Sequence, residues 1–171
     1  MKFIDTHTHL FLEHFNDDID AVIKTAIEKG VEKFFLPNID SESINDVLEL
    51  KKKYPDNCFP LSGLHPTSVN ENFVQELEMV EKLLSEHKFY GIGETGMDLY
   101  WDKTFIKEQE EAFAFQLELA KKHKLPIIIH VRDSFDEVFK VVDAHNNESL
   151  TGIFHCFTGD YTQAQKIIEY G

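Results

Sequence analysis

Histidines follow short apolar segments repeatedly in this chain of 171 residues. His7 and His9 form a His-x-His pair near the start, and His65 stands before a proline. His130 ends a run of isoleucines, and His155 follows Gly-Ile-Phe. Imidazole nitrogen is a good ligand for Zn²⁺, Mn²⁺ and Fe²⁺. Five of the nine histidines therefore occupy positions from which one metal site can be built.

A carboxylate accompanies these histidines in the segment Gly93-Glu-Thr-Gly-Met-Asp98. Taken alone, Glu94 is as suited to capping a helix or pairing with a lysine as to binding a metal ion. The histidines, taken singly, are equally compatible with hydrogen-bonded positions at strand ends. Together, nitrogen and carboxylate donors suit Zn²⁺, Mn²⁺ or Fe²⁺, and suit Mg²⁺ less well because it prefers oxygen ligands.

The apolar segments predict strands, each followed by a helical pattern. Continuous apolar character is typical of parallel strands that are buried on both faces. The predicted strands are Phe3–Ile4, Lys33–Leu36, Cys58–Leu61, Phe89–Ile92, Pro126–Ile129 and Gly152–Phe154. Apolar stripes at helical spacing predict helices over Ile19–Ile27, Ile44–Leu48, Phe73–Leu84, Ile106–Ala120 and Phe135–Val142, with another from Ala164. Gly30 is expected to end the first helix, and Asp40 or Ser41 to cap the second.

This alternation predicts a parallel α/β fold in a single domain, residues 1–171. A doubly wound sheet could close with six units. A (β/α)8 barrel would lack two units, since that fold typically needs about 250 residues. Both architectures collect functional residues at the carboxyl ends of their strands. We therefore expect His7, His9, Glu94, His130 and His155 to converge on one site.

Composition narrows the class of protein. The chain has 17 basic and 31 acidic residues and therefore a net charge of −14. This charge argues against a protein that coats nucleic acid by electrostatic attraction. The two cysteines, Cys58 and Cys156, do not make a disulfide framework and favour a reducing, cytoplasmic location. No apolar run approaches the about 18 residues of a membrane span, and the N-terminus lacks a signal peptide. No obligate protein partner is evident.

Five motifs together resemble the signature blocks of the TatD family of metal-dependent deoxyribonucleases. They are Asp5-Thr-His-Thr-His-Leu10, Gly63-Leu-His-Pro66, Gly93-Glu-Thr-Gly-Met-Asp98, Pro126-Ile-Ile-Ile-His-Val-Arg132 and His155-Cys-Phe-Thr-Gly159. The resemblance implies a (β/α)8 TIM barrel of the metal-dependent hydrolase type, of which about six β/α units lie in this chain. It also implies two divalent metal ions (Zn, Mn, Mg or Fe). His7 and His9 would hold one ion, His130 and His155 the other, and Glu94 would bridge them as the catalytic residue.

The resemblance also implies a substrate and a reaction. His65, Arg132 and Asp98 are expected on the substrate side of the site, where a phosphate of DNA or an oligonucleotide could lie. A metal-activated water would hydrolyse the phosphodiester bond, and the ions would supply the positive charge that the chain lacks. The same barrel and ligands also suit an amide, lactone or aminoacyl ester hydrolase, or an inactive binding scaffold.

The family pattern includes a later aspartate, on the eighth strand, that completes the first ion's ligands. No residue after Gly171 supplies it in this sequence, and Asp133 and Asp160 are poorly placed substitutes. We expect that the chain lacks the C-terminal part of its barrel. As 171 residues alone it should be a poor enzyme and a poor monomer, because unpaired edge strands attract association.

Overall fold

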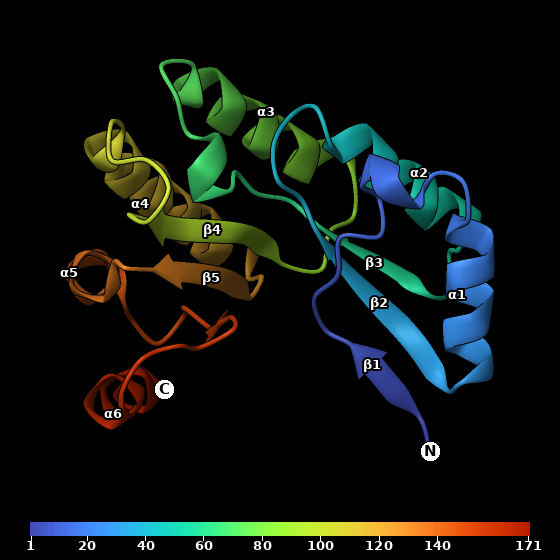
Figure 1. Ribbon diagram of the computed structural model, residues 1–171. Helices are drawn as coiled ribbons and strands as arrows, with labels where there is room; N and C mark the ends of the chain where they lie inside the picture. The colour runs from blue at the N-terminus through green and yellow to red at the C-terminus, as the bar shows by residue number, and fades with distance from the viewer.

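Six parallel strands alternate with six α-helices in the computed structural model, which describes residues 1–171 (Figure 1). The strands are β1 (Phe3–Asp5), β2 (Val31–Pro37), β3 (Cys58–Leu61), β4 (Ile92–Asp98), β5 (Ile127–Arg132) and β6 (Gly152–Phe154). The helices are α1 (Ile19–Glu28), α2 (Ile44–Lys53), α3 (Phe73–Glu86), α4 (Ile106–His123), α5 (Phe135–His145) and α6 (Tyr161–Glu169). Short 3-10 helices cover Glu13–Phe15 and Pro66–Ser68. None of the helices is both long and apolar enough to span a membrane.

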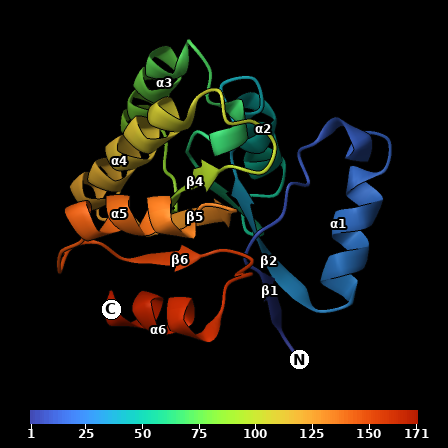
Figure 2. The same ribbon diagram turned by 60° about the vertical axis from the view of Figure 1, so that its left-hand side comes forward.

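The strands are arranged in their order along the chain. One parallel sheet has the order β1-β2-β3 and the other β4-β5-β6, and a parallel bridge between Ser62 and Ile92 joins them. A doubly wound sheet reverses its strand order at a switch point, whereas a barrel keeps sequential order. The helices lie around the outside of the curved sheet (Figures 1 and 2). The structure thus confirms barrel-type winding with six β/α units and excludes the doubly wound alternative.

Two glycines allow neighbouring strands to approach closely at the centre of the sheet. A Cβ atom on Gly63 would lie 2.7 Å from the Cα atom of Gly93, so a side chain there would separate the β3 end from β4. Gly96 has a φ of +135°, and a Cβ atom on it would lie 2.1 Å from the carbonyl oxygen of His130. Glycine tolerates both this conformation and this proximity. These contacts hold β4 beside β5, which carries His130, and beside the end of β3, which leads to His65.

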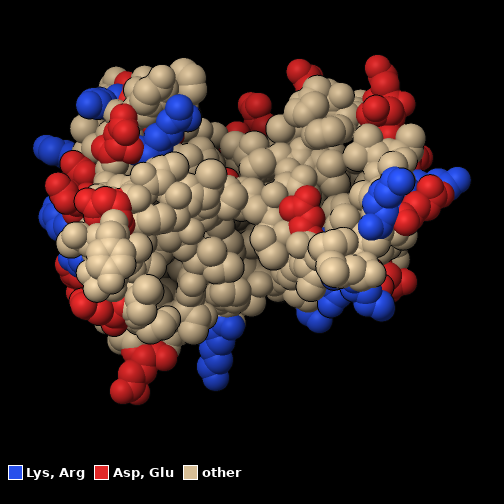
Figure 3. Space-filling model, turned by 60° about the horizontal axis from the view of Figure 1, so that its bottom comes forward, with Lys and Arg blue, Asp and Glu red and all other residues tan.

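Burial is uneven across the sheet. All seven residues of β4 are buried, and one core cluster of 24 buried residues includes side chains from both sheets. The edge strands contrast with it, because Phe3 and Ile4 in β1 and Ile153 in β6 are about half exposed. Each edge strand pairs on one side only. Figure 3 shows charged side chains at the margins of the molecule around a hollowed, largely uncharged middle.

The central strands begin or end later than the sequence predicts. The expected strand Phe89–Ile92 gives way to β4 from Ile92 to Asp98, and β5 extends to Arg132. Small polar residues of β4 are compatible with burial because helix α4 satisfies them: Thr95 Oγ1 accepts a hydrogen bond of 2.7 Å from Gln116 Nε2. Glu94 and His130 therefore lie within strands, not after them.

The first strand, unlike β4 and β5, ends before its histidines, and one helix cap differs from the prediction. β1 ends at Asp5, so His7 and His9 lie in the loop that follows it and do not belong to the strand. Gly30 follows α1 with a φ of +98°, as predicted for its C-terminal stop. Ser43, and neither Asp40 nor Ser41, is the N-cap of α2. Asp40 instead accepts a hydrogen bond of 3.1 Å from the Ser43 amide, which orders the turn before the helix.

Candidate metal centre

One cavity of about 680 Å³ collects the histidines that the sequence singled out. Its lining includes side chains from β4 and β5 and from the loops after β1, β3 and β6. These lining residues include His7, His9, His65, Glu94, His130, Arg132 and His155. The carboxyl ends of parallel strands meet at one edge, which is why residues far apart in sequence gather there.

Glu94 lies at the centre of this group, with 3% of its surface exposed. Its Oε2 atom is 2.9 Å from His7 Nε2 and 3.6 Å from His9 Nε2, and the two histidine nitrogens are 3.3 Å apart. Donor atoms bound tetrahedrally to one zinc ion at about 2.0–2.1 Å lie about 3.3 Å from one another. The three donors therefore fit a single divalent ion, and we call them the His7 group.

The second oxygen of Glu94 faces another pair of histidines. Glu94 Oε1 is 2.9 Å from His130 Nδ1 and 3.8 Å from His65 Nε2. These three donors lie within 4.8 Å of one another and form what we call the His130 group. The far nitrogen of His65, Nδ1, is 2.7 Å from the hydroxyl of Thr67, so the ring presents Nε2 to the cavity. One carboxylate thus contributes an oxygen to each group, as a ligand bridging two ions does.

Burial and hydrogen bonding set the charge of these side chains. Burial by itself raises the pKa of Glu94, but hydrogen bonds from His130, His7 and His9 outweigh it and hold that pKa well below its usual range. Burial lowers the pKa of His65 to about 4, against the attraction of Glu94. At neutral pH the cavity therefore offers an ionised carboxylate and a neutral imidazole, the forms that bind metal ions.

The His155 ring lies in the site because it stacks on the ring of His7. Its ring lies parallel to that of His7, with centroids 3.5 Å apart and an interplanar angle of 6°. Burial and repulsion from His7 lower the pKa of His155. The structure places His65 in the His130 group and His155 against His7, whereas the family resemblance implies that His155 pairs with His130. Both line the cavity, so both lie within reach of an ion held there.

Arg132 and Asp98, the other two residues expected on the substrate side, differ in their access. The guanidinium carbon of Arg132 lies 4.1 Å from the centre of the Tyr100 ring at the edge of the cavity, and both side chains line it. Asp98 is 1% exposed and does not line this cavity. Its Oδ2 atom is instead 2.9 Å from His130 Nε2, on the side of the ring away from Glu94. Substrate contact by Asp98 is therefore not available in this arrangement.

Sequence reasoning missed the buried polar side chains that support the site. Gln116 of α4 accepts a hydrogen bond of 2.8 Å from the Leu64 amide, next to His65. Gln109, one repeat earlier on the same helix face, bonds both backbone groups of Asp98 at 2.9 and 3.2 Å. Their signal in the sequence is two glutamines, seven residues apart, on a face otherwise made of apolar side chains.

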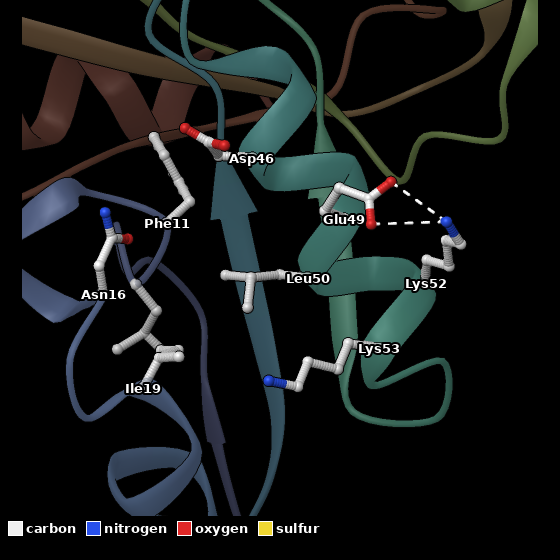
Figure 4. A pocket seen from close by; sticks show the side chains of 9 residues that line it. Phe11, Asn16, Ile19, Asp46, Glu49, Leu50, Lys52 and Lys53 are labelled. Carbon is white, nitrogen blue, oxygen red and sulfur yellow. Dashed lines mark hydrogen bonds and ion pairs between the residues drawn. The ribbon is translucent and has the colours of Figure 1, made fainter.

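A second hollow, of about 460 Å³, lies between the loop after β1 and helix α2 (Figure 4). Its floor is apolar, with Phe11 and Leu50. Its cations already have partners, because Lys52 pairs with Glu49 at 3.3 Å and Lys53 with Asp20 at 2.5 Å. It contains no histidine. Both groups of donors that lie close enough together to hold a metal ion line the histidine cavity.

Solved structures share this fold. The YjjV structure from Escherichia coli K12, a TatD homologue, superposes with a TM-score of 0.90 and 32% sequence identity, over 99% of this chain and 65% of that one. A TatD-family hydrolase from Entamoeba histolytica superposes with a TM-score of 0.82 at 23% identity, over 100% of this chain and 63% of that one. The second likeness supports the fold alone.

Sequence relatives agree with this likeness. The chain is 34% identical over 165 residues to the uncharacterized metal-dependent hydrolase YabD of Bacillus subtilis, covering 96% of this chain and 64% of that protein. It is 28% identical to the 3'-5' ssDNA/RNA exonuclease TatD of Salmonella typhimurium, over 98% of this chain and 64% of that protein. The chain spans slightly less than two thirds of the length of these relatives. The family model described as TatD related DNase matches residues 4–171, and the chain belongs to that family.

Proposed function

We propose that this protein hydrolyses phosphodiester bonds of single-stranded DNA with two divalent metal ions held in the histidine cavity. The observation that carries the proposal is the contact of Glu94 with two histidine groups, one at each carboxylate oxygen. Divalent ions held by these two groups would supply positive charge to bind a phosphate and would lower the pKa of a water molecule toward neutral. The relative in Salmonella typhimurium that is named an exonuclease supports a nucleic-acid substrate.

The side chains divide the work in this proposal. Glu94, ionised and buried, bridges the two sites, and His7 and His9 complete one of them. His130 belongs to the other, together with His65 or His155, which both line the cavity. Two sites rather than one are proposed because each carboxylate oxygen has its own set of nitrogen donors.

Substrate contacts come from a rim formed by Tyr100 and Arg132, which line the cavity, and by Trp101, which lies beside them. The Arg132 guanidinium suits a phosphate, and exposed aromatic rings suit unstacked bases of a single strand. Tyr100 and Trp101 are 53% and 68% exposed, so both rings keep accessible surface for such contacts beside the Arg132 guanidinium. A net charge of −14 disfavours long-range attraction of long DNA, which favours short or terminal substrates. Both cysteines are free thiols, in keeping with the cytoplasmic location that we propose.

A hydrolysis panel tests the proposal. A labelled single-stranded oligonucleotide, a carboxylic ester and an amide are each incubated with the chain plus Mn²⁺, Zn²⁺ or Mg²⁺, or with a chelator. Glu94→Gln serves as the inactive variant, and Glu118→Gln, an exposed glutamate on α4, as the matched control. We expect metal-dependent cleavage of the oligonucleotide that is lost only in Glu94→Gln. Faster cleavage of the ester or amide, or cleavage that survives in Glu94→Gln, would refute the proposal.

A further inference from the structure

Asp98, the last residue of β4, contacts two parts of the site at once. Its Oδ2 atom is 2.9 Å from His130 Nε2. Its Oδ1 atom accepts hydrogen bonds from the backbone amides of Tyr100 at 3.0 Å and Trp101 at 3.2 Å. One buried carboxylate therefore joins a histidine of the His130 group to the backbone of the rim.

The position of this carboxylate is itself fixed. The side-chain amide of Gln109 bonds both the amide and the carbonyl of Asp98, and 4% of Gln109 is exposed. In the register of β4 and β5, Asp98 pairs with Arg132, whose guanidinium lies over the Tyr100 and Trp101 rings at 4.1 and 5.1 Å. Asp98 is thus linked to the backbone of Tyr100 and Trp101 by hydrogen bonds, and it is the neighbour of Arg132 in the strand pairing.

We propose that Asp98 is a positioning residue that couples metal binding at His130 to the placement of the Tyr100–Trp101 rim. It acts on the metal by fixing which ring nitrogen of His130 carries hydrogen. Both ring nitrogens of His130 face carboxylates, Nε2 facing Asp98 and Nδ1 facing Glu94. A carboxylate only accepts hydrogen bonds, so when a metal ion replaces the hydrogen between Nδ1 and Glu94, Asp98 keeps the remaining hydrogen on Nε2 and the Nδ1 lone pair is available to the ion. A carboxylate behind a ligating histidine has this effect generally.

The rim is the second element that Asp98 acts on. Fixing the backbone of residues 100 and 101 holds two aromatic rings and the guanidinium against one another at the mouth of the cavity. That surface matches a nucleobase with its attached phosphate, so this part of the inference rests on the proposed function. A metal ion held by Glu94 and His130 and a nucleobase held by the rim would then stay at a constant distance from each other.

Asp98→Asn separates the two roles. The new amide oxygen can still accept from the Tyr100 and Trp101 amides, but the new NH₂ group faces His130 Nε2. Nε2 must then accept, the hydrogen moves to Nδ1, and Nδ1 cannot bind a metal ion. We expect the Zn²⁺ affinity of the His130 group to fall about 10- to 100-fold. Nitrogen NMR of the histidine rings should show the hydrogen on Nδ1 of His130 in place of Nε2.

Trp101 reports on the rim because it is the only tryptophan in the chain. Asp98→Asn should leave its emission unchanged. Asp98→Ala removes both acceptors, so it should shift the emission and, without added metal, weaken binding of a short oligonucleotide roughly tenfold. The matched control is Asp102→Asn, the same change at an exposed aspartate that caps Thr104, and it should alter neither property.

The outcomes separate this inference from the proposed function. A Zn²⁺ affinity within about twofold of the unsubstituted chain in Asp98→Asn, or hydrogen still on Nε2, would overturn the positioning role. An unshifted emission in Asp98→Ala would overturn the coupling to the rim. If Zn²⁺ affinity, ring tautomer and emission change as expected while no oligonucleotide is cleaved, the positioning role stands and the proposed function fails.

Discussion

Strands β4 and β5 at the centre of the sheet and strands β1 and β6 at its edges bring candidate metal ligands to the same cavity in different ways. β4 has seven buried residues and a neighbour on both sides. β1 and β6 have three residues each, paired on one side only. Glu94 and His130 lie inside central strands, whereas His7, His9 and His155 lie in loops after edge strands. The backbone of the central ligands is therefore fixed more firmly.

The same contrast holds for the contacts behind the ligands. His130 has Asp98 behind its ring and His65 has Thr67. The Nδ1 atoms of His7 and His9 are buried and have no hydrogen-bond partner. Their orientation rests on Glu94 and on the stacking of His155. The protein therefore preorganises the His130 group, while the His7 group depends on its shared carboxylate.

The largest expected effect tests that dependence. Glu94→Gln should reduce metal affinity at both groups by more than about 100-fold, because even the loss of an outer partner costs 10- to 100-fold. His9→Gln, a change at the edge, should lose the ion of the His7 group and keep the other. Metal content after exhaustive dialysis distinguishes the two variants. Equal loss in both variants would contradict the division into two groups.

Stability should follow the same division. Ile128 and Ile153 are partners in the β5–β6 register, but Ile128 is 5% and Ile153 54% exposed. Ile128→Ala should cost about 2–5 kcal/mol of unfolding free energy, as usual for a buried isoleucine. Ile153→Ala should cost about 1 kcal/mol or less, since exposed sites rarely cost more. Urea unfolding measures both, and similar losses would show that β6 is as firmly packed as β5.

The smallest expected difference between the central and edge strands is in how readily their backbone hydrogen bonds open. The Phe3 amide of β1 bonds Gly30 at 2.8 Å, and the Ile92 amide of β4 bonds Pro126 at the same distance. The bonds match in length but not in burial, because Phe3 is 48% exposed and Ile92 is fully buried. Hydrogen exchange should be about tenfold or more slower at Ile92. Faster exchange at Ile92 would reverse the ranking of centre and edge.

The sequence predicted the parts of the molecule that depend on pattern. Apolar runs located five of the six strands and met β4 only at Ile92, and helical spacing located all six helices. Sequential strand order could not be read from that pattern, and it was the resemblance of five motifs that pointed to a barrel. The gathering of Glu94 with four histidines around one cavity followed from placing function at strand ends.

Strand boundaries and supporting contacts were not predictable in the same way. Gly93, Thr95 and Gly96 look like a loop in sequence, yet they are buried in β4 because glycine contacts and Gln116 compensate for their poor strand propensity. The position of Asp98 behind His130 depends on the pairing of β4 with β5. Such a contact is long-range and leaves no local signal.

Electron paramagnetic resonance of the Mn²⁺-loaded chain tests the central claim, that Glu94 is shared by two adjacent metal ions. Two ions bridged by one carboxylate are close enough for their spins to couple. We predict two Mn²⁺ ions per chain with a coupled spectrum, and loss of the coupling in Glu94→Gln but not in Glu118→Gln. A single isolated Mn²⁺ per chain, or a coupled pair that survives in Glu94→Gln, would contradict the account.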